Sequence, residues 1–317
     1  MQPEALQQLP PDVGIGLKPA HYRDVLGGAF PGGQSPDGQS PDGQSPDGQY
    51  PNDQSPCGSP AWVEVHPQNY FVAGGPPHRW LSAVADILPV SFHSVGLSIG
   101  TAQGLDEAEL DQLAALCARY NPASISDHLS WSGNSSDRYP DLLPIPYTNA
   151  VLAHCAAQIG RVHDRLGRSI LIENPSRYMA FVQDEMDEVE FIDALCKRSG
   201  CGLLFDINNV EVSCTNLKLD PFAYIDAVNP ELVGEIHLAG HATEWHDDGP
   251  LLIDDHGSKV SELTWQLFGR FIGRAGPKPA LIEWDTNVPE YDVLMGEAAR
   301  VREVMADTAG HRASQAA

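Results

Sequence analysis

Seven short hydrophobic runs in this chain each carry a His, Asp, Glu or Asn at or near their end. They are short enough for strands that are buried on both faces. Imidazole and carboxylate groups are the usual ligands of divalent iron, manganese or zinc. Their repeated position predicts a metal centre assembled where buried strands end. In chain order the runs read VEVH (63–66), SFH (91–93), SISDH (124–128), LIEN (171–174), LLFDINN (203–209), EIHLAGH (235–241) and LIEW (281–284).

The elements that must position these residues alternate between strand-like and helix-like patterns. Alternation predicts parallel strands joined by right-handed crossovers. Eight strand candidates in a chain of 317 residues favour an α/β fold that closes into a (β/α)8 TIM barrel. The expected strands are 13–18, 62–67, 90–96, 124–129, 169–174, 202–208, 233–239 and 280–285, and the expected helices include 78–88, 106–120, 147–167, 185–199 and 261–274.

An open, doubly wound sheet is the alternative architecture. It would require a Gly-rich phosphate loop after the first strand. The segment GIGLKP (14–19) lacks the full GxGxxG pattern, so the barrel is the favoured fold.

In a barrel, the C-terminal ends of all strands meet at one mouth. This would bring together more ligands than one ion can use, and it favours two or three ions bridged by carboxylates. Buried acids such as Glu173 and Glu283 are costly without positive partners, which metal ions supply. A lone histidine at a strand end, such as His66, is more often a hydrogen-bonded structural residue. The converging residues are His66, His93, His128, Glu173, Asp206, Asn209, His237, Asp254, His256 and Glu283.

A pentapeptide repeat occupies residues 34–58, where QSPDG occurs three times and is followed by QYPND and QSPCG. Its Pro, Gly, Ser and Asp content cannot bury apolar surface, which predicts a disordered or turn-rich insertion over 33–60. A substrate-docking arm is one interpretation, and a neutral expansion is favoured because loops accept insertions cheaply. The rest is expected to form one barrel domain, 13–305, between tails 1–12 and 306–317.

Composition excludes several classes of function. The net charge of −24 argues against a nucleic-acid partner, which requires clustered Lys and Arg. The N-terminal residues lack the basic and apolar regions of a secretory signal, and no run has the length of a membrane span. Six cysteines without a CxxC pair are typical of free thiols in a reducing compartment, so a cytoplasmic location is expected.

The motifs, taken in order, resemble the multinuclear non-haem iron-dependent oxidases, the family that includes the oxazolone-forming enzyme of methanobactin synthesis. The resemblance covers residues 13–305 apart from the repeat, and it implies a fold similar to endonuclease IV and xylose isomerase. The segments that carry it are GIGLKPAHY, WVEVHPQNY, SFHSVGLSIG, SDHLSW, DLLPIPYT, LIENPSRY, GLLFDINNVEVS, GEIHLAGH, LIDDHG and LIEWD.

The resemblance implies that His93, His128, Glu173, Asp206, Asn209, His237, Asp254, His256 and Glu283 are iron ligands. Asn209 stands where endonuclease IV-like enzymes have a histidine. A weaker amide ligand would leave one iron with an exchangeable position. His66 and Asp127 then become candidates for groups that support the ligands. Asn69, Asn174, Asn208 and His241 become candidates for contacts with substrate.

By the same resemblance, the expected cofactors are two or three iron ions, with mixed Fe(II) and Fe(III), and the co-substrate is dioxygen. A cysteine of a ribosomally made precursor peptide would bind one iron through its thiolate. An oxazolone with a thioamide, a sulfur heterocycle or a related product would form. The family pattern also makes a small peptide-recognition partner protein an expected partner.

Two other functions stay open at this stage. One is a redox-neutral hydrolase or isomerase with several metals. The charge argues against a DNA substrate, and no lysine is expected beside the ligands for sugar isomerisation, with Lys18, Lys218 and Lys259 the nearest candidates. The other is a non-catalytic metal-binding or peptide-binding protein, which the complete ligand set disfavours.

Overall fold

The computed structural model describes residues 8–28, 58–133, 137–247 and 249–315. Of the insertion expected over 33–60, residues 33–57 lie outside the described residues and only 58–60 lie within them.

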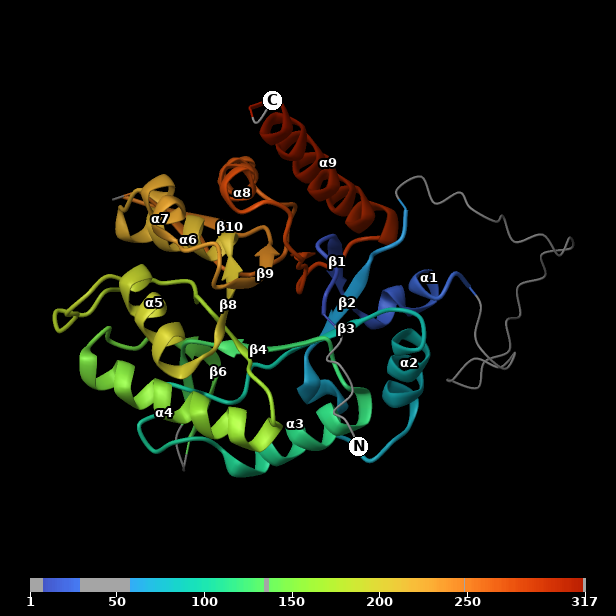
Figure 1. Ribbon diagram of the computed structural model, residues 1–317, viewed down its shortest axis with the longest axis horizontal. Coiled ribbons are helices and arrows are strands. Elements are labelled where there is room, and N and C mark those ends of the chain that lie inside the picture. Colours follow the sequence, from blue (N-terminus) through green and yellow to red (C-terminus); the bar gives the residue numbers. More distant parts are fainter. Residues whose placement is uncertain (1–7, 29–57, 134–136, 248, 316–317) are drawn as a thin grey trace, which may run out of the picture.

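Eight parallel strands close into a barrel with the order β1-β12-β9-β8-β7-β4-β3-β2 (Figure 1). Closure excludes the open sheet and confirms the TIM-barrel prediction. Each expected strand is present and is one to three residues shorter than its predicted range. The bounds are β1 Val13–Gly16, β2 Trp62–Val65, β3 Val90–His93, β4 Ser124–His128, β7 Leu171–Glu173, β8 Gly202–Asp206, β9 Val233–Leu238 and β12 Ala280–Ile282.

The helices surround the barrel, and the five that the periodicity predicts appear within a few residues of the expected bounds. Side chains that cap the N-terminus explain where several of these helices begin. Asp106 accepts the N–H groups of Ala108 and Glu109, and Asp187 forms a capping box with Glu190. The helices are α1 Tyr22–Val25, α2 Pro76–Ala85, α3 Glu107–Tyr120, α4 Asn149–Leu166, α5 Glu188–Ser199, α6 Ile207–Leu217, α7 Pro221–Ala227, α8 Glu262–Ala275 and α9 Tyr291–Gln315, with short 3-10 turns at Pro19–His21 and Pro67–Tyr70.

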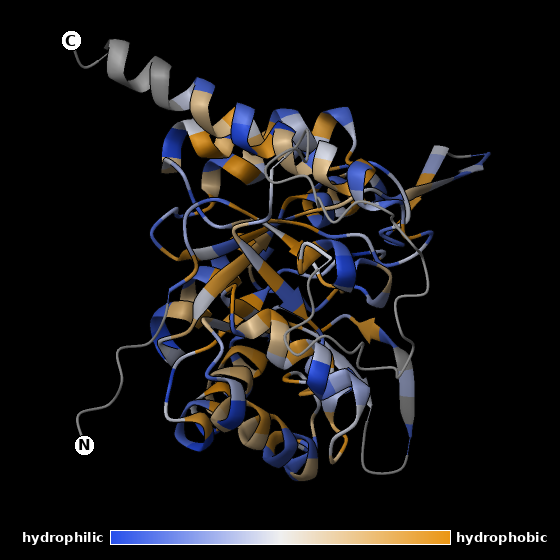
Figure 2. Cartoon of the chain, turned by 90° about the vertical axis from the view of Figure 1, so that its right-hand side faces the viewer, coloured by the Kyte–Doolittle hydropathy of each residue, from blue (hydrophilic) through white to orange (hydrophobic). Residues whose placement is uncertain are grey.

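The apolar core lies between the barrel and these helices. Phe205 on β8 packs against Phe271 on α8, with ring centroids 5.1 Å apart, and both side chains are fully buried. Figure 2 shows apolar colour on the strands and on parts of the surrounding helices, with hydrophilic residues on the outer surface. This packing leaves the interior of the barrel available for other side chains. Within the described residues, no helix is both long and apolar enough to cross a membrane.

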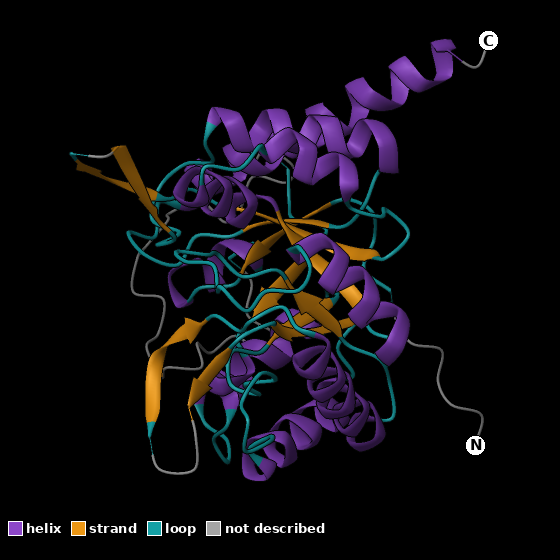
Figure 3. Ribbon diagram, turned by 90° about the vertical axis from the view of Figure 1, so that its left-hand side faces the viewer, coloured by secondary structure: helices purple, strands orange, loops and turns teal. Residues whose placement is uncertain are grey.

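Two antiparallel hairpins extend the loops that follow β4 and β9. The first pairs β5 (Trp131–Gly133) with β6 (Arg138–Leu143), and the second pairs β10 (Ala242–His246) with β11 (Gly249–Ile253). Figure 3 shows both on the same side of the molecule. Because each follows the C-terminal end of a barrel strand, both hairpins belong to the mouth.

Candidate metal centre

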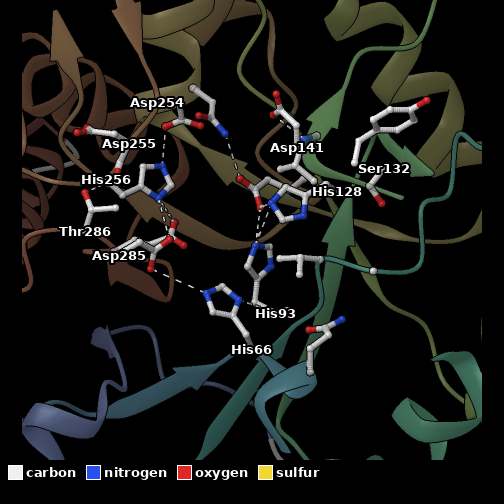
Figure 4. Close-up of a pocket in the computed structure, with 18 of the residues that line it drawn as sticks. His66, His93, His128, Ser132, Asp141, Asp254, Asp255, His256, Asp285 and Thr286 are labelled. Atoms are coloured by element: carbon white, nitrogen blue, oxygen red, sulfur yellow. Dashed lines mark hydrogen bonds and ion pairs between the residues drawn. The ribbon is translucent and has the colours of Figure 1, made fainter. Parts of the chain in front are cut away.

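The strand ends bring imidazole and carboxylate groups together at the mouth of the barrel. His93, His128, Glu173, Asp206 and His237 are the last or nearly the last residues of five strands, and each is at most 6% exposed. Glu283 follows β12, and the loop after β11 adds Asp254 and His256. A cavity of about 580 Å³ opens above them. Figure 4 shows the labelled histidines and Asp254 converging around this cavity.

His93, His128 and Glu173 form the first group of donors. The Nε2 atoms of His93 and His128 lie 3.1 and 3.2 Å from Oε2 of Glu173, and 3.2 Å from each other. Burial lowers the pKa of His93 to about 3 and that of His128 to about 4, so both rings are neutral at physiological pH. Neutral imidazoles and a carboxylate at these spacings have the form of three ligands of one ion.

Glu283 is the centre of a second group. Its Oε2 lies 3.0 Å from Nδ1 of His237 and 3.4 Å from Nδ1 of His256, whose Nε2 lies 2.6 Å from Oδ1 of Asp254. Burial would raise the pKa of Glu283, but His256 and His237 outweigh it and hold that pKa well below its ordinary value. In the metal-free protein this carboxylate is therefore ionised and lies between two histidines.

Glu173, Asp206 and Asn209 connect the two groups. The amide of Asn209 donates to Oε1 of Glu173 at 3.1 Å, on the side opposite the histidine pair. One oxygen each of Glu173, Asp206 and Asn209 is buried without a hydrogen-bond partner among the described residues. Burial and the charge of Glu173 raise the pKa of Asp206 well above its ordinary value.

These donors fit metal ions. Unpartnered buried oxygens are costly, and a cation at the centre would satisfy several at once. The geometric triads His93–His128–Glu173, His93–His237–Glu283 and Glu173–Asp206–His237 overlap, each with donor atoms within 4.8 Å of one another. His93, Glu173 and His237 each occur in two of these triads, so the triads form one connected set of donors. The donors are imidazole nitrogens and carboxylate oxygens, a set suited to iron, manganese or zinc.

The two residues expected to support the ligands lie on different sides of them. Nδ1 of His66 lies 3.1 Å from the carbonyl oxygen of His93, and its ring lines the cavity. Asp127 alternates with His128 on β4, so its side chain lies on the outer face of the barrel. Its carboxylate accepts the N–H groups of His128 and Leu97, which fixes the loop after β3.

The four residues expected to contact substrate are placed differently from one another. Asn69 lines a side cavity of about 320 Å³ that shares His66, Glu283 and Asp285 with the main one. Asn174 bonds through both ends of its amide to the backbone of Asp206 and ties β7 to β8. Asn208 donates to Asp254 and its carbonyl oxygen lies 2.8 Å from Nδ1 of His241. Asn208 therefore contacts the loop that carries Asp254 and His256, and the His241 side chain contacts Asn208.

The structure also adds residues that the strand-end pattern does not reveal. Glu64 and Glu235 lie inside the barrel below the ligands and are at most 3% exposed. Each stands two residues before a strand-end histidine, and two-residue spacing on a strand could have indicated the same face.

Of the three lysines named as the nearest candidates, Lys18 contacts Asp285, which is not one of the nine proposed ligands. Its Nζ contacts Oδ1 of Asp285 at 2.5 Å in the side cavity, because β1 ends next to β2 and β12. Burial would raise the pKa of Asp285, but hydrogen bonds from His256 and His66 and the charge of Lys18 lower it below its ordinary value.

Residues 50–306 match the family described as RiPP precursor modification enzyme MbnB/TglH/ChrH, where RiPPs are ribosomally synthesised and post-translationally modified peptides. The chain belongs to this family. The family resemblance seen in the motifs is thereby confirmed.

Curated relatives match most of this chain. A UPF0276 protein of Caulobacter sp. (strain K31) is 40% identical over 95% of this chain and 99% of its own length. Another, from Paraburkholderia phytofirmans (strain DSM 17436 / LMG 22146 / PsJN), is 44% identical over 77% of this chain and 80% of its own.

Endonuclease IV from Thermus thermophilus superposes with a TM-score of 0.53 at 13% identity, covering 94% of this chain and all of that chain. D-psicose 3-epimerase from Clostridium cellulolyticum superposes with a TM-score of 0.55 at 9% identity, covering 94% of this chain and 99% of that chain. At these identities the likeness extends to the fold alone, and it confirms the predicted endonuclease IV-like barrel.

Proposed function

We propose that this protein is an iron- and dioxygen-dependent oxidase that modifies cysteine residues of a ribosomally made precursor peptide. The observation that carries the proposal is the set of nine His, Asp, Glu and Asn residues, most of them buried, below an open cavity in a member of a precursor-modifying family. Two or three iron ions are the proposed cofactors, and the nine residues are the proposed ligands.

Each group of side chains has a role in this proposal. When bound, iron would supply the electrons that dioxygen needs and an attachment point for the cysteine thiolate. Asn209 is the weakest proposed ligand. The iron next to it is therefore the proposed ion with an exchangeable coordination position. Val95, Tyr139 and Leu142 give the cavity wall apolar surface for a peptide, and His66 stands at the junction of the two cavities.

A small peptide-recognition protein is the proposed partner. The hairpin of β10 and β11 follows β9 at the mouth, and Trp245 on it is 78% exposed. An exposed aromatic side chain at this place is compatible with a contact surface for such a partner.

Oxygen uptake tests the reaction type. The purified protein would be loaded anaerobically with Fe(II), supplied with a cysteine-bearing peptide encoded beside its gene, and then exposed to oxygen. The proposal predicts oxygen consumption that depends on both iron and the cysteine, with a Cys→Ser peptide as control. Peptide conversion without oxygen, or with Mg²⁺ or Zn²⁺ in place of iron, would instead indicate the redox-neutral reaction.

A further inference from the structure

A polar layer lies inside the barrel directly below the proposed ligands. Ser91, Ser126 and Glu235 each stand two residues before a histidine of the centre, on the same strand and therefore on the same inward face. Glu64 joins them from β2, and all four are at most 3% exposed. Barrels of this type usually fill this layer with Val, Ile and Leu. Two buried acids in it are costly and therefore require an explanation.

The two acids face one nitrogen of one histidine. Nε2 of His237 lies 3.3 Å from Oε2 of Glu64 and 3.7 Å from Oε1 of Glu235. These three atoms are buried and have no hydrogen-bond partner among the described residues. The other nitrogen, Nδ1, lies 3.0 Å from Glu283 in the metal centre. The ring of His237 thus separates the centre above from the carboxylate pair below.

Strands far apart in the barrel order hold this arrangement together. β2 and β9 are not neighbours, so Glu64 and Glu235 meet across the interior. Ser91 on β3 donates to Oε2 of Glu235 at 3.2 Å, which directs that carboxylate inward.

His93 provides an internal comparison. Its Nδ1 lies 2.8 Å from the hydroxyl oxygen of Ser126, while its Nε2 faces Glu173 and His128. Both histidines therefore present one nitrogen to the centre and the other to the polar layer. The difference is that a hydroxyl supports His93, whereas two carboxylates face His237.

A neutral imidazole can bind a metal through one nitrogen while the other nitrogen carries a hydrogen. A carboxylate that accepts this hydrogen fixes the tautomer and makes the ligating nitrogen more basic. We infer that Glu64 and Glu235 are positioning residues that hold His237 with Nδ1 toward the metal centre and thereby strengthen the binding of the ion next to Glu283. This inference rests on the metal centre of the proposed function, but not on iron or on oxygen chemistry.

Metal affinity is the direct test, with Co²⁺ as the probe and a competing chelator to set the free concentration. Glu64→Gln and Glu235→Gln keep the side-chain shape and replace one carboxyl oxygen by an amide nitrogen, which cannot accept a hydrogen bond. Each should weaken the binding of one ion by about 10- to 100-fold and change the visible absorption of the bound Co²⁺. Glu188→Gln is the matched control, because Glu188 is 5% exposed and accepts a 2.6 Å hydrogen bond from Tyr147 away from the centre. The Glu188→Gln variant should bind Co²⁺ with the same affinity as the unmodified protein.

Melting of the metal-free proteins separates positioning from a merely structural role. Both variants should keep a cooperative melting transition in the metal-free state, and their Co²⁺ binding should nevertheless be weaker. A lowered melting temperature with unchanged Co²⁺ affinity and spectrum would overturn the inference.

Two other results would also overturn it. If either variant lost one whole ion at saturation and bound the others normally, the acids would bind an ion of their own. If the unmodified protein bound no divalent metal, both this inference and the metal centre would fail. By contrast, a protein that binds metal as predicted but consumes no oxygen would contradict only the proposed oxidase reaction.

Discussion

Glu173 is the residue that connects the two halves of the proposed centre. Its Oε2 faces His93 and His128, while its Oε1 accepts the amide of Asn209. The two oxygens of Glu173 thus face different sets of proposed ligands. This is the arrangement expected of a carboxylate that bridges two ions. Its neutral amide counterpart could not bridge in this way.

Glu173→Gln should therefore lose at least one bound ion per chain and all turnover, because it removes the proposed bridging charge. Metal analysis and the oxygen assay measure the two effects, and circular dichroism checks the fold. Asp206→Asn is a second test that retains a capping side chain, since Asp206 accepts the N–H of Asn209 at the start of α6. A variant with full metal content and turnover would remove that residue from the centre.

His66→Ala should lower turnover while most of the metal stays bound. Its ring contacts the carbonyl oxygen of His93 and the carboxylate of Asp285, and it lines both cavities, so its loss disturbs the pocket more than the ligands. His93→Ala is the comparison, and it should lose metal. Equal metal loss in the two variants would make His66 a ligand.

At the residue scale, the sequence predicts the strand-end positions well because strand periodicity and barrel topology determine them together. The strand-end pattern alone does not reveal Glu64 or Glu235, and only their two-residue spacing from His66 and His237 indicates that they share the inward face. Lys18 is one of three candidate lysines in the sequence, but its contact with Asp285 cannot be predicted, because it depends on the closure that makes β1 and β12 neighbours.

At the element scale, the strands and the capped helices α3, α4, α5 and α8 follow from local patterns. Helix α6 does not. It begins directly after β8, with Asp206 as its N-cap, and Val210 and Val212 within it favour strands by propensity. Burial of this helix against the barrel outweighs that propensity, so tertiary packing decides its structure.

Gly14 on β1 tests how tightly the elements fit. A Cβ at this position would lie 2.4 Å from ring atoms of Trp62 on the adjacent strand. Gly14→Ala should therefore lower the free energy of unfolding by about 1–3 kcal/mol. Thermal unfolding of the metal-free protein measures this change in the free energy of unfolding.

Gly160 in the middle of α4 is the matched control, because a Cβ there would meet nothing within 4 Å. Gly160→Ala should raise the free energy of unfolding by up to about 1 kcal/mol through helix propensity. If both variants changed the free energy of unfolding in the same direction, the close contact between β1 and Trp62 would not be a determinant of stability.

At the scale of the whole molecule, the strands of one closed barrel lie between Val13 and Ile282. Helix α9 continues beyond the expected boundary at 305 and ends at Gln315. Closure could be predicted because eight strand patterns alternate with helices. The hairpins β5–β6 and β10–β11 could not be predicted from the sequence. Each is an extension of the loop that follows a barrel strand.

Deleting residues 34–58 and joining Gly33 to Ser59 should leave metal content and melting temperature nearly unchanged. The repeat offers almost no apolar residues to a core, and shortening a connection changes loop-closure entropy little. Turnover on a free cysteine peptide should persist. Lost turnover with metal still bound would assign the repeat a role in binding substrate.

The number of iron ions per chain tests the central claim most directly. The protein would be loaded anaerobically with Fe(II), freed of unbound metal by desalting, and analysed for iron and protein. The nine converging ligands predict two or three irons per chain, and fewer in Glu173→Gln. One iron or none per folded chain would contradict a multinuclear centre.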